Sequence, residues 1–356
     1  MERLPKEIDL VLISQPEHVY YFSGHMHSPT GLAHRAPSHL LITRDLKSTL
    51  ILDGKAKPSP DQVADRIVNG SWNATNLRTS RHQAAAQAAR HIISEKSFET
   101  IGIERNLTPT TILHPSTRTV DLTPIIHELR QSKDPDEIMM IKSAIRIGES
   151  FHKAARSFIE PGLTEIELYA RCLEVATRQA SQPFVMMCDF ASGPHLRQGG
   201  PPGPRVIQPG DNVMLDIFPY IDGYRCDITN TLNAGNMPTD DQLAAIDAAK
   251  AALTASEQLA KPGISAGEIF EAQDNAIREY NSDWHLDHHA GHALGLEHLE
   301  TPDFVQGNPT ELVEGAIITF EPGVYGPDFQ GGRIEHNYLV TGDGLQRLSH
   351  HQLGLV

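Results

Sequence analysis

The sequence predicts two domains, an α/β domain followed by an α+β domain. The chain has 356 residues, and at about 150 residues per domain this length favours two separate cores. Up to about residue 130, short apolar runs alternate with a helical segment. Beyond that point helices and strands follow one another without the regular alternation of parallel βαβ units. We therefore expect domains at residues 1–131 and 132–356.

In the first domain, the expected strands are short apolar runs bounded by turn residues. These runs lie at residues 9–14, 20–24, 38–45, 48–54 and 100–104. Residues 82–96 combine helical spacing with a high alanine content, which favours a helix. Residues 64–68 form an apolar run that is too short to assign.

The second domain opens with an expected helix that starts at Asp134-Pro135-Asp136-Glu137, where acidic residues interact favourably with the helix dipole. It should end before Pro161-Gly162, and another helix should start at Thr164. Residues 192–205 are rich in glycine and proline and lack periodicity, so they predict a long, functional loop. A hairpin, two helices, a histidine-rich segment and two strands follow, at 212–231, 239–260, 265–279, 285–298, 315–321 and 332–341.

The hairpin is the most informative of these elements. Asp222-Gly223 stands between apolar, alternating runs, and this dipeptide favours a two-residue turn in which both residues have positive φ. Such a turn pairs Ile221 with Tyr224, and the register then follows by counting. It places Asp216 directly opposite Thr229.

The same register brings two carboxylates together. Asp227 is expected opposite Phe218, so Asp216 and Asp227 become diagonal neighbours on one face, with Cα atoms roughly 7–8 Å apart. Converging carboxylates repel each other unless a cation lies between them. One divalent metal ion or a pair of them explains this arrangement, and an exposed hairpin with two solvated acids is the alternative.

The histidines are concentrated in one segment. Five of the 19 histidines of the chain fall between residues 285 and 298, namely His285, His288, His289, His292 and His298. Imidazole is a common ligand of Zn, Mn, Fe and Co. His288 and His292 would share one face of a helix, although Gly291 and Gly295 fit a loop or strand equally well. A single histidine could equally be structural.

Two glutamates follow in the last expected strands. Glu321 stands where an apolar strand stops at Pro322-Gly323, and Glu335 is expected inside a strand, on the same face as Arg333. A buried Arg–Glu salt bridge is the alternative explanation of that pair. Four carboxylates and one imidazole, without a thiolate, suit two divalent ions, whose charge the four acids balance.

Composition excludes several classes of protein. The chain has 45 acidic and 30 basic residues, a formal net charge of −15, which argues against a nucleic-acid partner. No apolar run approaches the roughly 20 residues of a membrane span, and the N-terminus does not resemble a signal peptide. The three cysteines have no paired spacing, so we expect reduced thiols and a cytoplasmic protein.

The order of the motifs resembles that of the pita-bread metallohydrolase superfamily, which includes methionine aminopeptidase, prolidase, aminopeptidase P and creatinase. The matching motifs are Asp216–Asp227, His288-x-x-Gly291-His292-x-x-Gly295, Phe320-Glu321-Pro322-Gly323 and Arg333-Ile334-Glu335. The likeness begins near residue 134. The first domain resembles the creatinase/prolidase N-terminal domain, which points to the prolidase, aminopeptidase P and creatinase branch.

The resemblance implies a pita-bread catalytic domain with five metal ligands, Asp216, Asp227, His292, Glu321 and Glu335. It implies two divalent ions, manganese first and Co, Zn or Fe as alternatives, bridged by Asp227 and Glu335. A hydroxide bridging the ions would attack an amide or peptide carbonyl, as in Xaa-Pro dipeptidases and aminopeptidases. The implied catalytic residues are Glu321, His288, Arg333 and His298, and the implied substrate-binding residues are His195, His288 and His298. A homodimer is also implied.

Two positions depart from the family pattern. A family histidine in the loop after Ala191-Ser192-Gly193 falls on Gly199 or Gly200, with His195 nearest in sequence. A second falls on Leu299, one residue after His298. Since one residue in a strand reverses the face, His298 should point away from the metal ions unless a bulge corrects the register.

These departures leave other functions open. One alternative is a hydrolase or lyase of a small non-peptide metabolite, similar to creatinase, ectoine hydrolase or dimethylsulfoniopropionate lyase. Another is a binding module that keeps the fold without catalysis. His25, His27 and His34 of the first domain are candidate substrate contacts across a dimer, or else ordinary loop histidines.

Overall fold

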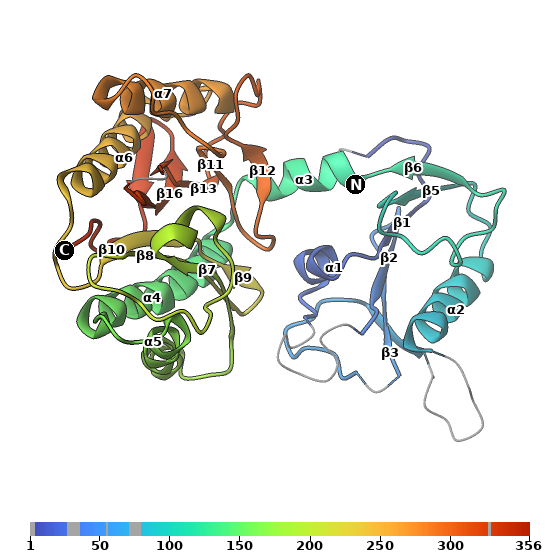
Figure 1. Ribbon diagram of the computed structural model, residues 1–356. Helices are drawn as coiled ribbons and strands as arrows, with labels where there is room; N and C mark the ends of the chain where they lie inside the picture. Colours follow the sequence, from blue (N-terminus) through green and yellow to red (C-terminus); the bar gives the residue numbers. More distant parts are fainter. Residues whose placement is uncertain (1–3, 27–35, 55, 71–79, 327–328) are drawn as a thin grey trace. The chain divides into compact units, whose positions relative to one another are not determined.

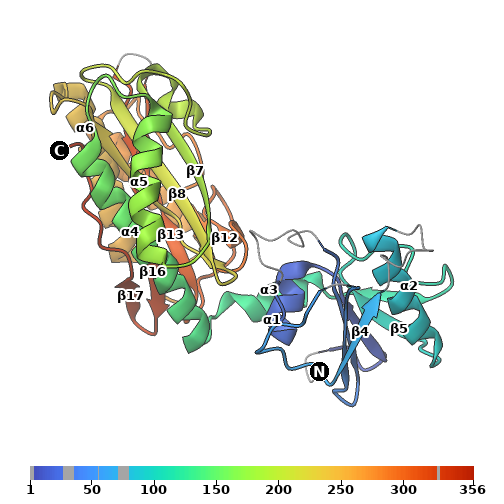
Figure 2. The same ribbon diagram turned by 90° about the horizontal axis from the view of Figure 1, so that it is seen from below.

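The computed structural model describes residues 4–26, 36–54, 56–70, 80–326 and 329–356. The chain forms two compact units, Met1–Arg130 and Gln131–Val356 (Figures 1 and 2). His27 and His34 lie outside the described residues.

The first unit is built on a mixed six-stranded sheet with the order β4-β3-β2-β1-β5-β6. The central strand β1 pairs antiparallel with β2 and parallel with β5. Its strands are β1 Leu10–Ile13, β2 His39–Thr43, β3 Ser48–Asp53, β4 Arg66–Gly70, β5 Thr100–Ile103 and β6 Arg118–Asp121. Its helices are α1 Pro16–Ser23, α2 Arg81–Ser94 and α3 Thr123–Gln131. The predicted α/β class is confirmed.

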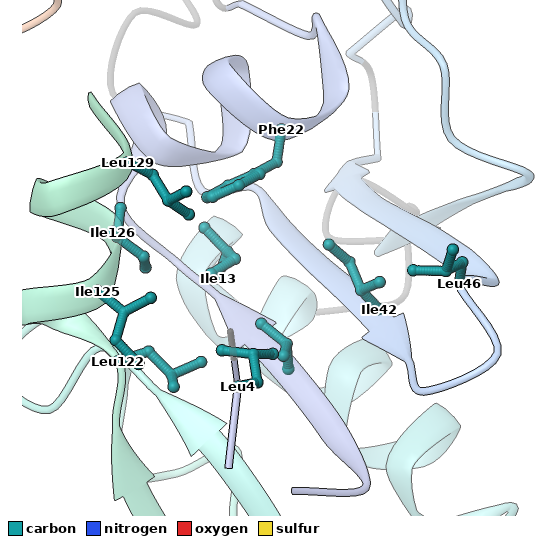
Figure 3. Close-up of a pocket in the computed structure, with 10 residues that line it drawn as sticks. Leu4, Ile13, Phe22, Ile42, Leu46, Leu122, Ile125, Ile126 and Leu129 are labelled. Atoms are coloured by element: carbon teal, nitrogen blue, oxygen red, sulfur yellow. The ribbon is translucent and has the colours of Figure 1, made fainter. Parts of the chain in front are cut away.

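Alternation along β1 creates one apolar core on each face of this sheet. Leu10 and Leu12 pack in a cluster with alanines of α2, whereas Val11 and Ile13 pack in a cluster with residues of α1 and α3. The second face carries a pocket of about 590 Å³, into which Phe22 of α1 and Leu129 of α3 point (Figure 3). Its lining residues within the described part of the chain are all apolar, so none of them offers a catalytic group.

The strand expected at residues 20–24 is wrong, because these residues belong to helix α1. Pro16 occupies the start of the helix, and Gly24 ends it with a φ of 70°. The buried carboxylate of Glu104 accepts the backbone N–H groups of Ser14 and Gln15 at the helix N-terminus. These interactions provide partners for backbone groups that the ends of a helix leave without one. Because Glu104 lies far from α1 in the sequence, its contribution was not apparent from the local pattern. The elements β4, β6 and α3 were not assigned from the sequence.

The second unit stacks helices on both sides of its strands, α4 and α5 on one side and α6 and α7 on the other (Figure 1). The helices are α4 Pro135–Phe158, α5 Glu165–Ala180, α6 Asp240–Leu259 and α7 Ala266–Tyr280. All four agree with the predicted positions. Capping boxes at Asp134, Thr164, Thr239 and Ser265 fix their starts.

Two main sheets lie between these helices, one with the order β10-β8-β7 and one with the order β12-β11-β13-β16-β17. The first contains β7 Val185–Ser192, β8 Asn212–Ile221, β9 Tyr224–Arg225 and β10 Ile228–Asn233. The second contains β11 Gly291–Ala293, β12 Glu300–Asp303, β13 Ile317–Phe320, β16 His336–Thr341 and β17 Gly344–Arg347. A small pair, β14 Gly323–Val324 and β15 Gly332–Arg333, completes the mixed α+β unit.

The predicted hairpin register is confirmed. Asp222 and Gly223 have φ values of 51° and 85°, Ile221 pairs with Tyr224, and Asp216 pairs with Thr229. The long loop expected at 192–205 has partial order, since β7 ends at Ser192 and a 3₁₀ helix, η1, spans Gly193–Gln198.

Three buried histidines pack against one another behind β10. The ring of His152 on α4 stacks on that of His351, with ring centroids 4.5 Å apart, and His336 lies 4.6 Å from His351. His152 Nε2 lies 3.0 Å from the carbonyl oxygen of Ile228. Burial lowers the pKa of His152 from 6.5 to about 4.

Acidification should therefore destabilise the protein. Below pH 6.5 the unfolded chain protonates His152, whereas the folded protein keeps it neutral down to about pH 4. The unfolded state then binds more protons, so stability falls as pH falls through this range. When the pH falls from about 7.5 to about 5, we expect His152 to lower the free energy of unfolding by about 2 kcal/mol. Urea unfolding at both pH values measures it.

The matched variants are His152→Gln and His350→Gln, the latter at an exposed position. The first should weaken the dependence of the unfolding free energy on pH, and the second should not. An unchanged pH dependence in His152→Gln would contradict the assignment.

Candidate metal centre

The structure brings the five predicted ligands together from two sheets. Asp216 lies on β8 and Asp227 directly before β10, while His292 lies on β11, Glu321 directly after β13 and Glu335 directly before β16. All five are at most 5% exposed. Acids are rarely buried to this degree unless they are paired or bind a metal ion.

Distances within the cluster fit cation binding. His292 Nε2 lies 3.3 Å from Asp227 Oδ2 and 3.6 Å from Glu321 Oε1. Asp227, His292 and Glu335 each offer a ligand atom within 4.8 Å of the others. Among the described residues, no hydrogen-bond donor reaches the buried Oδ1 atoms of Asp216 and Asp227. A buried carboxylate oxygen without a donor is costly, and a metal ion would remove that cost.

The pKa shifts of the four acids also indicate a site for cations. Burial and the neighbouring carboxylates raise the pKa of Asp227 and of Glu335 well above the usual range. Burial also raises the pKa of Asp216. For Glu321, burial alone would raise the pKa, but His289 and Arg333 bring it below its usual value. The four acids can be ionised together only when cations compensate their charges.

Hydrogen bonds around the cluster fix the orientation of its members. The hydroxyl of Thr229 donates to Glu335 Oε2 at 2.6 Å, and the hydroxyl of Thr319 donates to Oε1. His292 Nδ1 donates to the carbonyl of Ala293 at 2.8 Å, which leaves Nε2 facing the acids. Such outer contacts orient metal ligands and set the histidine tautomer.

The expected pairing of Arg333 with Glu335 inside one strand is wrong. Glu335 lies in a break between β15 and β16, where its N–H donates to the carbonyl of Thr229 at 2.9 Å. The chain crosses to β10 there, so strand alternation is lost. Arg333 instead forms an ion pair with Asp216, and its second guanidinium nitrogen lies 3.8 Å from Glu321 Oε2.

His298 faces the cluster despite its one-residue offset. His298 lies in the bend that precedes β12, outside the strand in which the one-residue offset would reverse its face. The pairing of β11 with β12 shifts register only beyond it, between the pairs His292–Asp303 and Ala293–Glu300. His298 Nδ1 lies 3.4 Å from Asp227 Oδ2, and its ring lies 4.3 Å from that of Phe218. Leu299 is 53% exposed.

The other histidines differ in their placement. His288 is half-buried, and its Nε2 lies 3.5 Å from the hydroxyl of Tyr325. His195 is exposed in η1, and among the described residues no hydrogen bond or ion pair joins it to the five ligands. His285 is exposed beside Asp287. His25 of the first unit is buried, and its Nδ1 accepts the N–H of Ser59 at 3.1 Å.

Two residues beside the five predicted ligands had no role assigned from the sequence: His289 was named only as a member of the histidine cluster, and Asp189 was not named. His289 Nδ1 lies 3.1 Å from Glu321 Oε1. Asp189 lies on β7, directly opposite Asp216 in the antiparallel register. The apolar run around Asp189, which follows Ser181-Gln182-Pro183, was the available strand signal, but β7 was not assigned from it.

Comparison with known proteins identifies the family. Residues 139–342 match metallopeptidase family M24, and residues 5–132 match the creatinase/prolidase N-terminal domain. The chain belongs to metallopeptidase family M24. It is a metal-dependent hydrolase, and the predicted pita-bread fold with a creatinase-like first domain is confirmed.

Relatives of this M24 protein align over almost the whole chain. An uncharacterized peptidase of Staphylococcus aureus strain USA300 is 28% identical, with 98% of this chain and 96% of the relative covered. The structure of prolidase from Pyrococcus furiosus is 28% identical with a TM-score of 0.81, covering 97% of each chain. Prolidase from Pyrococcus horikoshii OT3 is 27% identical with a TM-score of 0.83, covering 98% of this chain and 96% of that one. Among the described residues, none of the helices has the length and apolar character to cross a membrane.

Proposed function

We propose that this M24 hydrolase cleaves dipeptides of the Xaa-Pro type with two divalent metal ions. One observation carries the proposal: the five buried residues converge, and His298 faces them from the bend before β12. The similarity to a prolidase over the whole chain supports the same substrate class.

The donor set of the proposed centre is hard and anionic. Asp216, Asp227, His292, Glu321 and Glu335 would hold the ions, with Asp227 and Glu335 shared between them, and manganese suits such ligands. When bound, divalent ions lower the pKa of water and polarise a carbonyl oxygen. The unpaired Oδ1 atoms of Asp216 and Asp227 support this assignment.

The remaining roles fall to residues around the ligands. Glu321 would carry the proton, because its carboxylate lies among His289, His292 and Arg333. Arg333 would hold Glu321 and Asp216 in place through its guanidinium group. His298 and His288 would contact the substrate, and the exposed His195 is a weaker candidate for the same role.

A panel of substrates tests the function. The protein loaded with Mn²⁺ should hydrolyse Ala-Pro and Leu-Pro, while Ala-Ala tests the preference for proline. Activity should disappear with a chelator and return with added metal. No turnover of any dipeptide by the loaded protein would overturn the proposal.

One observation favours the second candidate, a hydrolase or lyase of a small non-peptide metabolite. The family histidine falls on Gly199 or Gly200, which carry no side chain, and both have a positive φ, of 61° and 105°. The carboxylate of Asp189 lies beside this position, since a Cβ atom at Gly199 would come within 2.8 Å of its Oδ2. Efficient release of proline from dipeptides would exclude this candidate. Turnover of N-acyl amines or cyclic amides without dipeptide cleavage would support it.

The variant His298→Ala should lower kcat/KM at least about tenfold, a loss of about 1.4 kcal/mol of transition-state binding. Leu299→Ala is the matched control, because Leu299 is exposed beside it and should keep activity within about twofold. Steady-state kinetics on one dipeptide measures both variants. The reverse order of effects would show that Leu299 occupies the position of the family histidine.

We also propose a homodimer in the cytoplasm. The resemblance to the prolidase branch supports the dimer. The free thiols of Cys172, Cys188 and Cys226 favour a reducing compartment.

A further inference from the structure

An additional carboxylate, Asp189, stands beside the proposed metal ligands. Asp189 on β7 and Asp216 on β8 are direct partners in an antiparallel pair, so their side chains share one face of the sheet. The two acids differ in access, because the side chain of Asp189 is 44% exposed and that of Asp216 is 4% exposed. Asp189 therefore lies where the buried cluster opens to solvent.

The loop after β7 holds this carboxylate in place. The N–H of Gly200 donates to Asp189 Oδ1 at 2.9 Å, and the N–H of Phe190 donates to the carbonyl of Gly200 at 2.7 Å. Gly199 has a φ of 61°, and a Cβ there would come within 2.8 Å of Asp189 Oδ2. The glycine at position 199 thus leaves room for the Asp189 carboxylate in the position that the Gly200 N–H fixes.

The charge of Asp189 is only weakly compensated within the protein. Arg333 is engaged by Asp216 and lies 3.8 Å from Glu321, whereas its distance to Asp189 Oδ2 is 3.9 Å. The firm partner of Asp189 is a neutral backbone N–H group. A half-exposed, pre-positioned carboxylate of this kind can form a charge-assisted hydrogen bond with an incoming cation.

We propose that Asp189 binds a cationic group of the substrate, namely an ammonium group, and so determines specificity. The proposal rests on the proposed dipeptide hydrolysis and names the substrate class further. Two sources of the ammonium share this chemistry, the free N-terminus of a dipeptide and a lysine side chain. Asp189 is a binding residue here and is not a metal ligand.

The experiment uses pairs of substrates that differ by one ammonium group. It compares three Mn²⁺-loaded proteins: the wild type, Asp189→Asn and the control Asp247→Asn, which alters an exposed acid on α6. The ratio of kcat/KM for Ala-Pro to that for propionyl-proline measures the preference for an N-terminal ammonium. The ratio for Lys-Pro to that for norleucyl-proline measures the preference for a side-chain ammonium. In Asp189→Asn, one of these two preference ratios should fall at least about tenfold, mainly through KM. Metal content and the hydrolysis of propionyl-proline, which has no ammonium group, should change little.

The outcomes separate this proposal from the proposed function. Wild-type ratios retained in Asp189→Asn would overturn the role of Asp189, while dipeptide hydrolysis would still stand. No turnover by the wild type would overturn the hydrolysis. In that event, titration calorimetry with alaninamide and propionamide tests Asp189 directly: the cation should bind more tightly to wild type than to Asp189→Asn, and equal binding would overturn the proposal.

Discussion

The variant Glu335→Ala should lose at least about a thousandfold in kcat and retain much less metal than the wild type. Glu335 is fully buried, and its two carboxylate oxygens accept hydrogen bonds from the hydroxyl groups of Thr229 and Thr319. Its carboxylate would bridge both ions, so its loss affects the whole centre rather than one ligand position. Removing an orienting contact alone typically costs 10–100-fold, and loss of a bridging ligand should cost more.

Metal content by elemental analysis and kcat by steady-state kinetics measure this effect. Glu335→Gln keeps the shape of the side chain and should show the same loss, which separates metal binding from packing. Glu271→Ala, at an exposed position on α7, is the control and should behave as wild type. Wild-type metal content and activity in Glu335→Gln would contradict the ligand assignment.

Removal of the metal should lower the thermal unfolding midpoint by about 5–10 °C. A ligand present at one hundred times its Kd stabilises the folded state by about 2.7 kcal/mol, and 1 kcal/mol shifts the midpoint of a unit of this size by about 2–4 °C. Without the ions, the carboxylates of Asp227 and Glu335 are buried close together and raise each other's pKa.

Thermal unfolding with a chelator and with added Mn²⁺ tests this expectation. The midpoint of the wild type should rise with metal concentration, whereas that of Glu335→Gln should depend on metal far less. Magnesium is a useful comparison because it demands near-ideal octahedral geometry and keeps several of its waters. A midpoint that is insensitive to both chelation and added metal would contradict a metal centre that is part of the folded state.

The parts of the fold that were predicted correctly depend on local chemistry. The turn at Asp222-Gly223 set the hairpin register without help from the rest of the protein. Helices α4 to α7 also start at local signals, since each begins with a capping box in the structure. The five residues expected as metal ligands were named from the resemblance in motif order, and the structure brings those residues together.

The parts that were missed depend on distant contacts. Residues 20–24 were expected as a strand because of their local apolar character. The carboxylate of Glu104, which accepts the N–H groups at the N-terminal end of α1, directly follows β5. Glu335 leaves its strand because its N–H reaches β10. His298 faces the cluster from a bend before β12, where the strand alternation on which the expectation rested does not apply.

The origin of the ligands in two sheets also affects how long the folded state lasts. Asp216 and Asp227 come from one local hairpin, whereas His292, Glu321 and Glu335 follow much later in the chain. Contacts between such distant segments form late in folding, so the ions would bind a site that is completed after the main barrier. Interactions absent from the transition state chiefly slow unfolding. The bound ions would therefore prolong the lifetime of the folded protein more than they would hasten its formation.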